Sequence, residues 1–156
     1  MLGKIRRSSS FNDLVLQTLR ELSKQYSGLD LVAVNLRKRE KELFEECKSY
    51  LEKSQRERAI IYANEIAEIR KTLTVVTGTK LVLERAITRL ETIKEVSPAV
   101  RELNGLFGDV KNSLKLLTEV MPVMAPEINA LNKVVAEILN TAQIESVPAI
   151  EPLVIK

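Results

Sequence analysis

The chain of 156 residues has no histidine, no tryptophan and a single cysteine, Cys47. Histidine is the side chain most often used for proton transfer near neutral pH and for binding transition metals. A helical diiron site, whose Glu-x-x-His motif requires histidine, is therefore excluded. One cysteine cannot form an internal disulfide. We therefore expect no catalytic residues, no metal site and no cofactor.

Glycine-rich loops and long apolar runs are also absent. The five glycines are scattered and none belongs to a phosphate-binding loop. No run of eighteen apolar residues predicts a membrane span, and residues 1–10 lack the apolar stretch of a signal peptide. The chain is therefore expected in the cytoplasm and is not expected to be an enzyme.

The charged residues are unevenly distributed along the chain. Residues 1–58 carry 13 Lys and Arg against 9 Asp and Glu, whereas residues 98–156 carry 5 against 7. A basic front and an acidic rear favour either an anionic surface as partner or attraction between the two ends of the chain. Nucleic acid is not an expected partner, because the basic residues alternate with acidic ones and no aromatic platform accompanies them.

Two heptad patterns are the most informative feature that is present. Apolar residues recur at alternating spacings of four and three from Val15 to Tyr50, with Glu40 as the charged exception. A second pattern runs from Ala59 to Leu90, with Lys80 as its exception. A repeat that averages 3.5 residues holds one narrow apolar stripe against a partner helix.

The two patterns are near mirror images about Ser54 and Gln55, which predicts an antiparallel hairpin with its tip at those residues. Each arm would reach about 60 Å at about 1.5 Å per residue. Such a shape suits a polymer subunit better than an enzyme. In the predicted pairing Leu36 faces Leu73 and Leu43 faces Ile66. The main predicted seam residues are Leu36, Leu43, Ile66, Leu73, Leu83 and Leu90.

The sequence predicts an all-α fold made of this hairpin, two further helices and an extended C-terminal tail. Ser10 is a suitable N-cap for the first helix, and Ser97 followed by Pro98 is suitable for the start of the third. Pro148 and Pro152 indicate that the tail is not helical throughout. We expect helices over residues 11–53, 56–96, 98–121 and 126–142, flanked by a basic N-terminal tail (1–10) and a proline-containing tail (143–156).

The basic residues near the N-terminus have two interpretations. Residues 1–10 mix basic side chains with Leu2 and Ile5, which is typical of a segment that settles on an anionic bilayer but also of a disordered terminus. The first helix carries further basic residues among acidic ones, as either a solvated face or a lipid-binding face. The candidate membrane-binding residues are Leu2, Lys4, Ile5, Arg6, Arg7, Arg20, Lys24, Arg37, Lys38 and Lys41.

Two segments of the second predicted helix resemble a known family. Residues 58–71 (RAIIYANEIAEIRK) and 83–92 (LERAITRLET) closely resemble the second helix of ESCRT-III proteins, most of all the archaeal cell-division branch called CdvB. The segment Leu43-Phe44-Glu45 and the proline-bracketed junction of the third and fourth helices are also similar. The resemblance covers about residues 11–142.

This resemblance implies a cytoplasmic subunit that polymerises with itself and with paralogous subunits on the inner face of the cell membrane. It implies membrane remodelling in cell division or vesicle release, and a closed and an open form joined by a hinge, for which Ser97, Pro98 and Gly78 are candidates. It also implies disassembly by a AAA ATPase with an MIT domain that engages the C-terminal tail. The docking candidates there are Val147, Pro148, Ile150, Pro152 and Leu153. The alternative is a soluble coiled-coil adaptor or scaffold without membrane activity.

Overall fold

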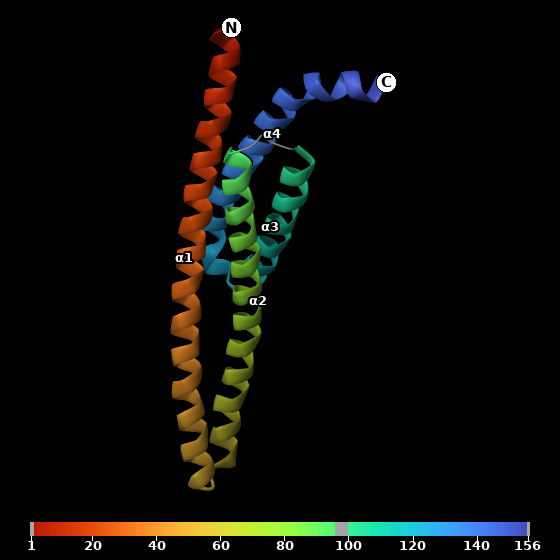
Figure 1. Ribbon diagram of the computed structural model, residues 1–156. Helices are drawn as coiled ribbons and strands as arrows, with labels where there is room; N and C mark the ends of the chain where they lie inside the picture. Colours follow the sequence, from red (N-terminus) through yellow and green to blue (C-terminus); the bar gives the residue numbers. More distant parts are fainter. Residues whose placement is uncertain (1, 96–99, 156) are drawn as a thin grey trace.

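A computed structural model describes the backbone of residues 2–95 and 100–155 and the side chains of residues 11–94 and 103–140. The described residues form α1 (Leu2–Glu52), α2 (Arg56–Glu95), α3 (Val100–Val120), the short 3-10 helix η1 (Pro122–Met124) and α4 (Ala125–Ile155). Figure 1 shows α1 and α2 as a long antiparallel hairpin, with α3 and α4 packed near its open end. The predicted all-α hairpin with two additional helices is confirmed.

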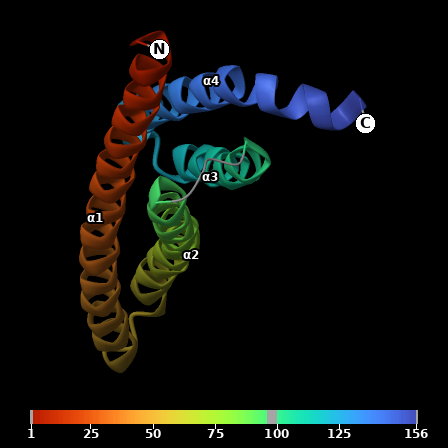
Figure 2. The ribbon, with the colours of Figure 1, turned by 45° about the horizontal axis from the view of Figure 1, so that its top comes forward.

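The two shorter helices form a second layer on one side of the hairpin. α3 packs against α2, α4 packs against α1, and the two contact each other. Figure 2, which brings the open end of the hairpin forward, shows this arrangement. The hairpin therefore has a four-helix part near its open end and a two-helix part near its tip.

The predicted seam is the interface between α1 and α2. Leu83 and Leu90 are fully buried, and both belong to the large core that α3 and α4 complete. Leu43 and Ile66 are buried in a smaller cluster nearer the tip, where Leu36 and Leu73 pack at its edge. We call the two-helix part, residues 37–73, the outer arm.

Both charged exceptions in the seam have partners on the opposite helix. Glu40 of α1 forms an ion pair with Arg70 of α2. Lys80 of α2 lies 2.6 Å from Asp30 of α1, and its ammonium group lies 5.3 Å from the centre of the Tyr26 ring. Because each charge has its partner at one position only, these pairs favour the observed alignment of the two helices over a shifted one.

The hairpin turns at the predicted tip. Ser54 has a positive φ of 62°, the backbone amide of Gln55 donates to the carbonyl of Tyr50 at 2.8 Å, and the amide of Ser54 donates to that of Leu51 at 3.1 Å. These two bonds are the Schellman pattern, which satisfies the last carbonyls of a helix before the chain reverses. Tyr50 also stacks on Tyr62 across the hairpin, with ring centres 5.4 Å apart.

The N-terminal boundary of the first helix differs from the prediction. α1 begins at Leu2 rather than near residue 11, so most of the expected basic tail belongs to the helix. Ser10 is not an N-cap but an interior residue. Each residue that extends an existing helix gains a hydrogen bond, and residues 2–10 contain no proline to prevent the extension.

The expected extended C-terminal tail is also wrong. α4 continues to Ile155, past Pro148 and Pro152. Each proline removes one amide donor, and their spacing of four residues places both defects on the same side of the helix. Helices commonly accommodate such defects by bending. Figure 1 shows the C-terminal part of α4 turning away from the rest of the molecule.

Candidate membrane-binding surface

The basic candidates of α1 lie on one side of the helix. Arg20, Lys24, Arg37, Lys38 and Lys41 are all exposed. At 3.6 residues per turn all five fall within less than half of the helix circumference, so they form one broad strip along the helix. Lys48, which sequence reasoning missed, is also exposed and extends the strip by two turns. We call these six residues the basic face of α1.

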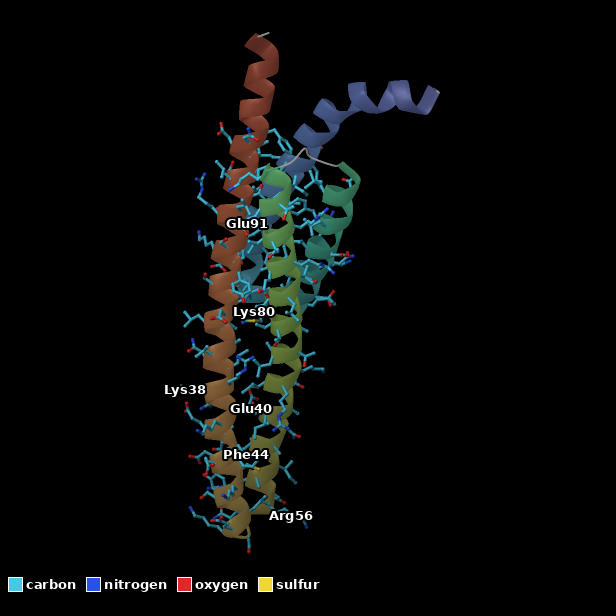
Figure 3. All side chains as sticks on the ribbon, in the orientation of Figure 1. Lys38, Glu40, Phe44, Arg56, Lys80 and Glu91 are labelled. Carbon is cyan, nitrogen blue, oxygen red and sulfur yellow. The ribbon has the colours of Figure 1, made fainter. Side chains whose placement is uncertain are left out.

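The basic face is turned away from the second layer. α4 contacts the opposite side of α1, where the buried Gln25 donates a hydrogen bond to the backbone carbonyl of Glu127 at 3.3 Å. Figure 3 shows Lys38 projecting from the side of α1 that is remote from α2. Nothing in the described part of the chain therefore covers this strip.

Within the described part of the chain, no ion pair neutralises the charges of the basic face. The ion pairs among the described side chains join Arg39 to Glu42 and three pairs of residues between helices, and none includes a member of the basic face. Asp30, on the same side of α1, is already paired with Lys80. The other acidic residues on this side of α1 are Asp13, Glu45 and Glu52, and Glu91 of α2 lies near Arg20 and Lys24. They are fewer than the six basic residues, so the surface keeps a positive excess.

Exposed apolar side chains accompany these charges. Leu31 and Val34 do not belong to the seam, and they are 62% and 53% exposed on the outer side of α1. Leu16, Phe44 and Leu51 are 43% to 55% exposed at the edge of the seam. Apolar residues outside the heptad pattern are not buried by the hairpin, so the sequence already indicated that these side chains are exposed. They were not included among the membrane-binding candidates predicted from the sequence. Basic head groups beside apolar side chains are typical of surfaces that rest in a bilayer interface.

A shallow groove between α1 and α2 continues this surface toward the open end. Leu16, Leu19, Arg20 and Lys24 of α1 line it, and Ile87 and Glu91 of α2 close its other side. Two members of the basic face thus lie beside apolar side chains in a depression rather than on a ridge. The groove is open and holds no cluster of side chains suited to catalysis.

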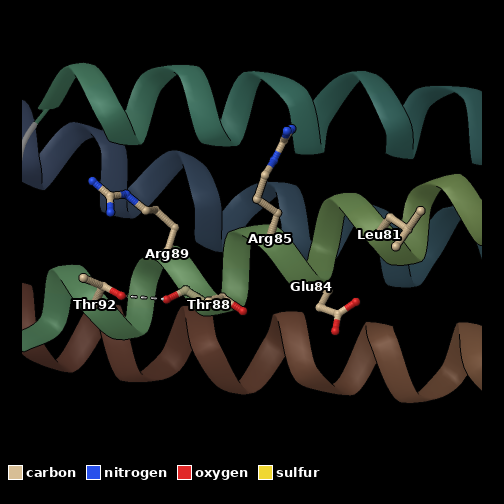
Figure 4. A pocket seen from close by; sticks show the side chains of 6 residues that line it. All are labelled: Leu81, Glu84, Arg85, Thr88, Arg89 and Thr92. Carbon is tan, nitrogen blue, oxygen red and sulfur yellow. Dashed lines mark hydrogen bonds between the residues drawn. The ribbon is translucent and has the colours of Figure 1, made fainter.

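A second depression lies on the outer side of α2 and is drawn in Figure 4. Its lining includes Leu81, Glu84 and Arg85. Arg85 reaches toward α3 and pairs with Asp109 at 2.8 Å, while Thr92 bonds to the backbone of its own helix at Thr88. Arg85 and Thr92 thus already have partners within the protein, and the ion pair of Arg85 joins α2 to α3.

The described residues contain no group of three or more potential ligands that could hold a metal ion. They also contain no helix that is long and apolar enough to cross a bilayer. The resolved pKa shift belongs to Tyr62, whose pKa is raised above its usual value by the neighbouring Tyr50 hydroxyl. This tyrosine pair stacks at the hairpin tip.

The remaining candidates are placed only in part. The backbone of residues 2–7 is helical and spaces Leu2 and Ile5 one turn apart, while the side chains of that segment lie outside the described residues. Ser97 and Pro98 also lie outside the described residues, and Gly78 lies within the unbroken helix α2. The docking candidates at positions 147–153 have a helical backbone within α4.

The fold and surface define a class of protein: an elongated helical hairpin, closed on one side by two further helices, with an uncovered basic and apolar strip along its first helix. The chain is similar to Cell division protein B1 of Sulfolobus acidocaldarius, with 37% identity over 117 residues, or 72% of this chain and 53% of that protein. It is also similar to Cell division protein B of the same organism, with 27% identity over 144 residues, or 83% of this chain and 54% of that protein. No protein-family profile and no solved structure matches it.

Both relatives are ESCRT-III proteins of the CdvB type, and the chain is homologous to them. The resemblance found in the sequence is thereby confirmed. The chain spans about half the length of the curated relatives it matches, 53% and 54%.

Proposed function

We propose that this chain acts in cell division as an ESCRT-III-like subunit that polymerises on anionic membrane and constricts it. The names of its relatives support the role in cell division. The observation that supports membrane binding is the basic face of α1, whose charges have no partner among the described side chains and lie beside exposed apolar residues. In this proposal the protein is cytoplasmic and lies on the inner face of the cell membrane when assembled.

The first test is binding to liposomes that contain anionic lipid. In a variant with Arg37→Gln, Lys38→Gln and Lys41→Gln, three charges leave the middle of the basic face. A basic residue near an anionic surface contributes about 1 kcal/mol, so affinity should fall about a hundredfold. Added salt should weaken parental binding, because the Debye length is about 8 Å at physiological ionic strength.

The matched control removes three exposed lysines that lie elsewhere, Lys71, Lys94 and Lys111, each changed to Gln. It has the same net charge as the first variant and should bind nearly as well as the parent. Binding must be measured below the assembly threshold, because avidity in a polymer would hide the loss. An equal loss of liposome affinity in both variants would show that net charge alone matters. Sedimentation of the parent that does not depend on anionic lipid would favour a soluble adaptor.

The N-terminal end of α1 is proposed as a second membrane contact. Basic residues alone rarely anchor a protein, so we expect Leu2 and Ile5 to enter the bilayer interface beside Lys4, Arg6 and Arg7. Changing Leu2 and Ile5 to Ser, or the three basic residues to Ser, should each weaken liposome binding. If both variants bind as the parent does, the contact is confined to the basic face.

The C-terminal part of α4 is proposed to engage a AAA ATPase through its MIT domain. The candidates Val147, Pro148, Ile150, Pro152 and Leu153 lie on a helical backbone, which suits helix packing better than an extended peptide. Calorimetric titration with an MIT domain, using the parent and a chain ending at residue 142, would measure this contact. Equal affinity of the two chains would place the contact elsewhere. Paralogous ESCRT-III subunits are proposed as further partners in the polymer.

A further inference from the structure

Two exposed glycines lie inside the long helices of the hairpin at positions where packing does not require glycine. Gly28 lies in α1 and Gly78 in α2, and a side-chain carbon at either position would meet no atom within 4 Å. Alanine would fit at both sites and would be a better helix former. A close approach of neighbouring groups therefore does not explain these glycines.

The two glycines lie at nearly the same height of the hairpin. Asp30 and Lys80, which form an ion pair at 2.6 Å, each follow one of the glycines by two residues. Because α1 and α2 run in opposite directions, the glycines are offset by four residues along the axis. That offset is about 6 Å at about 1.5 Å per residue, close to one helical turn. The two glycines therefore lie within about one helical turn of each other along the hairpin.

The neighbours of both glycines weaken the helices further. Gly28 follows Ser27, and glycine and serine together are a common cause of helix kinks. Thr77 and Thr79 flank Gly78, and their hydroxyl groups donate to the backbone carbonyls of Leu73 and Val75 in the preceding turn. Hydroxyl bonds of this kind compete with the helix ladder and often bend a helix.

The surrounding structure changes close to this height. Toward the open end, α4 is held to α1 by the bond from Gln25 to Glu127, and α3 approaches α2 where Thr79 lies 3.5 Å from the carbonyl of Ser113. Toward the tip, the outer arm consists of α1 and α2 alone, as Figures 1 and 2 show. The two-helix part is thinner than the four-helix part and therefore bends more easily. Gly28 and Gly78 lie within a few helical turns of the place where the four-helix part ends.

We propose that Gly28 and Gly78 form a flexible joint at which the outer arm bends relative to the four-helix part. The joint itself is a property of the monomer. Its use rests on the proposed function: subunits whose arms bend can join into filaments of different curvature as a membrane neck narrows. Gly78 is also one of the hinge candidates named from the sequence, but the joint bends the hairpin itself, whereas a hinge at Ser97 and Pro98 would move α3 and α4.

The test compares the parent with a variant in which Gly28 and Gly78 are both alanine. Spin labels at Glu65→Cys in the outer arm and Lys115→Cys in α3, both exposed positions, report the angle between the two parts in the monomer. Cys47→Ser removes the native thiol from every chain used. Pulsed electron resonance should give a broad distance distribution for the parent and a narrower one for the alanine variant. Thermal unfolding should shift upward by about 2–4 °C for each glycine replaced.

The matched control is Gly105→Ala with Gly108→Ala in α3, where a side-chain carbon also meets no atom within 4 Å. It should raise the unfolding temperature similarly without narrowing the distribution. Equal narrowing in the control, or an unchanged width in the Gly28 and Gly78 variant, would overturn the joint. Electron microscopy of filaments on anionic vesicles should then show a smaller range of diameters for the alanine variant. Absence of filaments for every chain would refute the proposed function and leave the monomer result standing.

Discussion

Ser54 holds the positive φ that lets the hairpin reverse between α1 and α2. A left-handed backbone costs about 1–2 kcal/mol for a residue with a side chain, and glycine avoids that cost but loses more freedom on folding. Ser54→Gly should therefore raise the free energy of unfolding by about 0.5–1 kcal/mol. Thermal denaturation would measure this as a rise of about 2–4 °C.

Gln55→Gly is the control for that experiment, since Gln55 is the next residue of the same turn and has no positive φ. It adds the flexibility of glycine without relieving strain, so it should lower stability. Equal effects of the two substitutions would mean that the left-handed backbone at Ser54 is not the source of the gain.

The sequence predicted the contacts of individual side chains less well than it predicted the helices. The heptad pattern identified Glu40 and Lys80 as charged exceptions, but it did not identify their partners. Arg70 and Asp30 lie outside the heptad pattern, which therefore gives no sign that they pair with these exceptions, and it does not indicate that the ring of Tyr26 lies beside Lys80. Which surface charge meets which exception depends on side-chain geometry across the hairpin, which periodicity does not encode.

At the scale of elements, the same seam has two environments. Leu83 is fully buried in the core that α3 and α4 complete, whereas Ile66 is 6% exposed in the outer arm, which has no second layer. Leu83→Ala should lower the free energy of unfolding by about 2–5 kcal/mol, and Ile66→Ala should lie at the lower end of that range. Chemical denaturation at low protein concentration measures both. An equal cost would indicate that another subunit covers the outer arm in solution.

The hairpin was predictable because its signal is long. More than twenty seam positions fix the pairing, the tip and the antiparallel direction, and a shift would expose many apolar side chains at once. The outer boundaries of α1 and α4 were not predictable in the same way. At Ser10 and at Pro148 the local signals favour a helix end, yet α1 and α4 continue through these positions. Local signals decide less where each helix is already established by its packed portion.

At the scale of the whole molecule, the two long sides of the hairpin differ in what covers them within the described structure. One side is occupied by α3 and α4, in which the described side chains, those of residues 103–140, include four acidic and three basic ones. The side of α1 remote from them carries the basic face and the exposed apolar residues. This difference explains why only part of the candidate surface could be predicted: the sequence identifies basic residues, but the fold decides which of them remain uncovered.

The second layer is also expected to restrain assembly. α3 and α4 cover apolar side chains of the hairpin, and Phe107 of α3 is 1% exposed within that contact. Phe107→Ala should weaken the contact by about 3–5 kcal/mol, which favours an open form whose released apolar surfaces bind neighbouring subunits. We therefore expect this variant, and a chain lacking residues 98–156, to polymerise at lower concentration than the parent. Light scattering and negative-stain microscopy would measure the threshold concentration for assembly.

Ile66→Ala is the control, because it destabilises the outer arm without releasing α3. It should leave the threshold near that of the parent. A threshold that stays unchanged in both test chains would mean that α3 and α4 stabilise the hairpin without restraining its assembly.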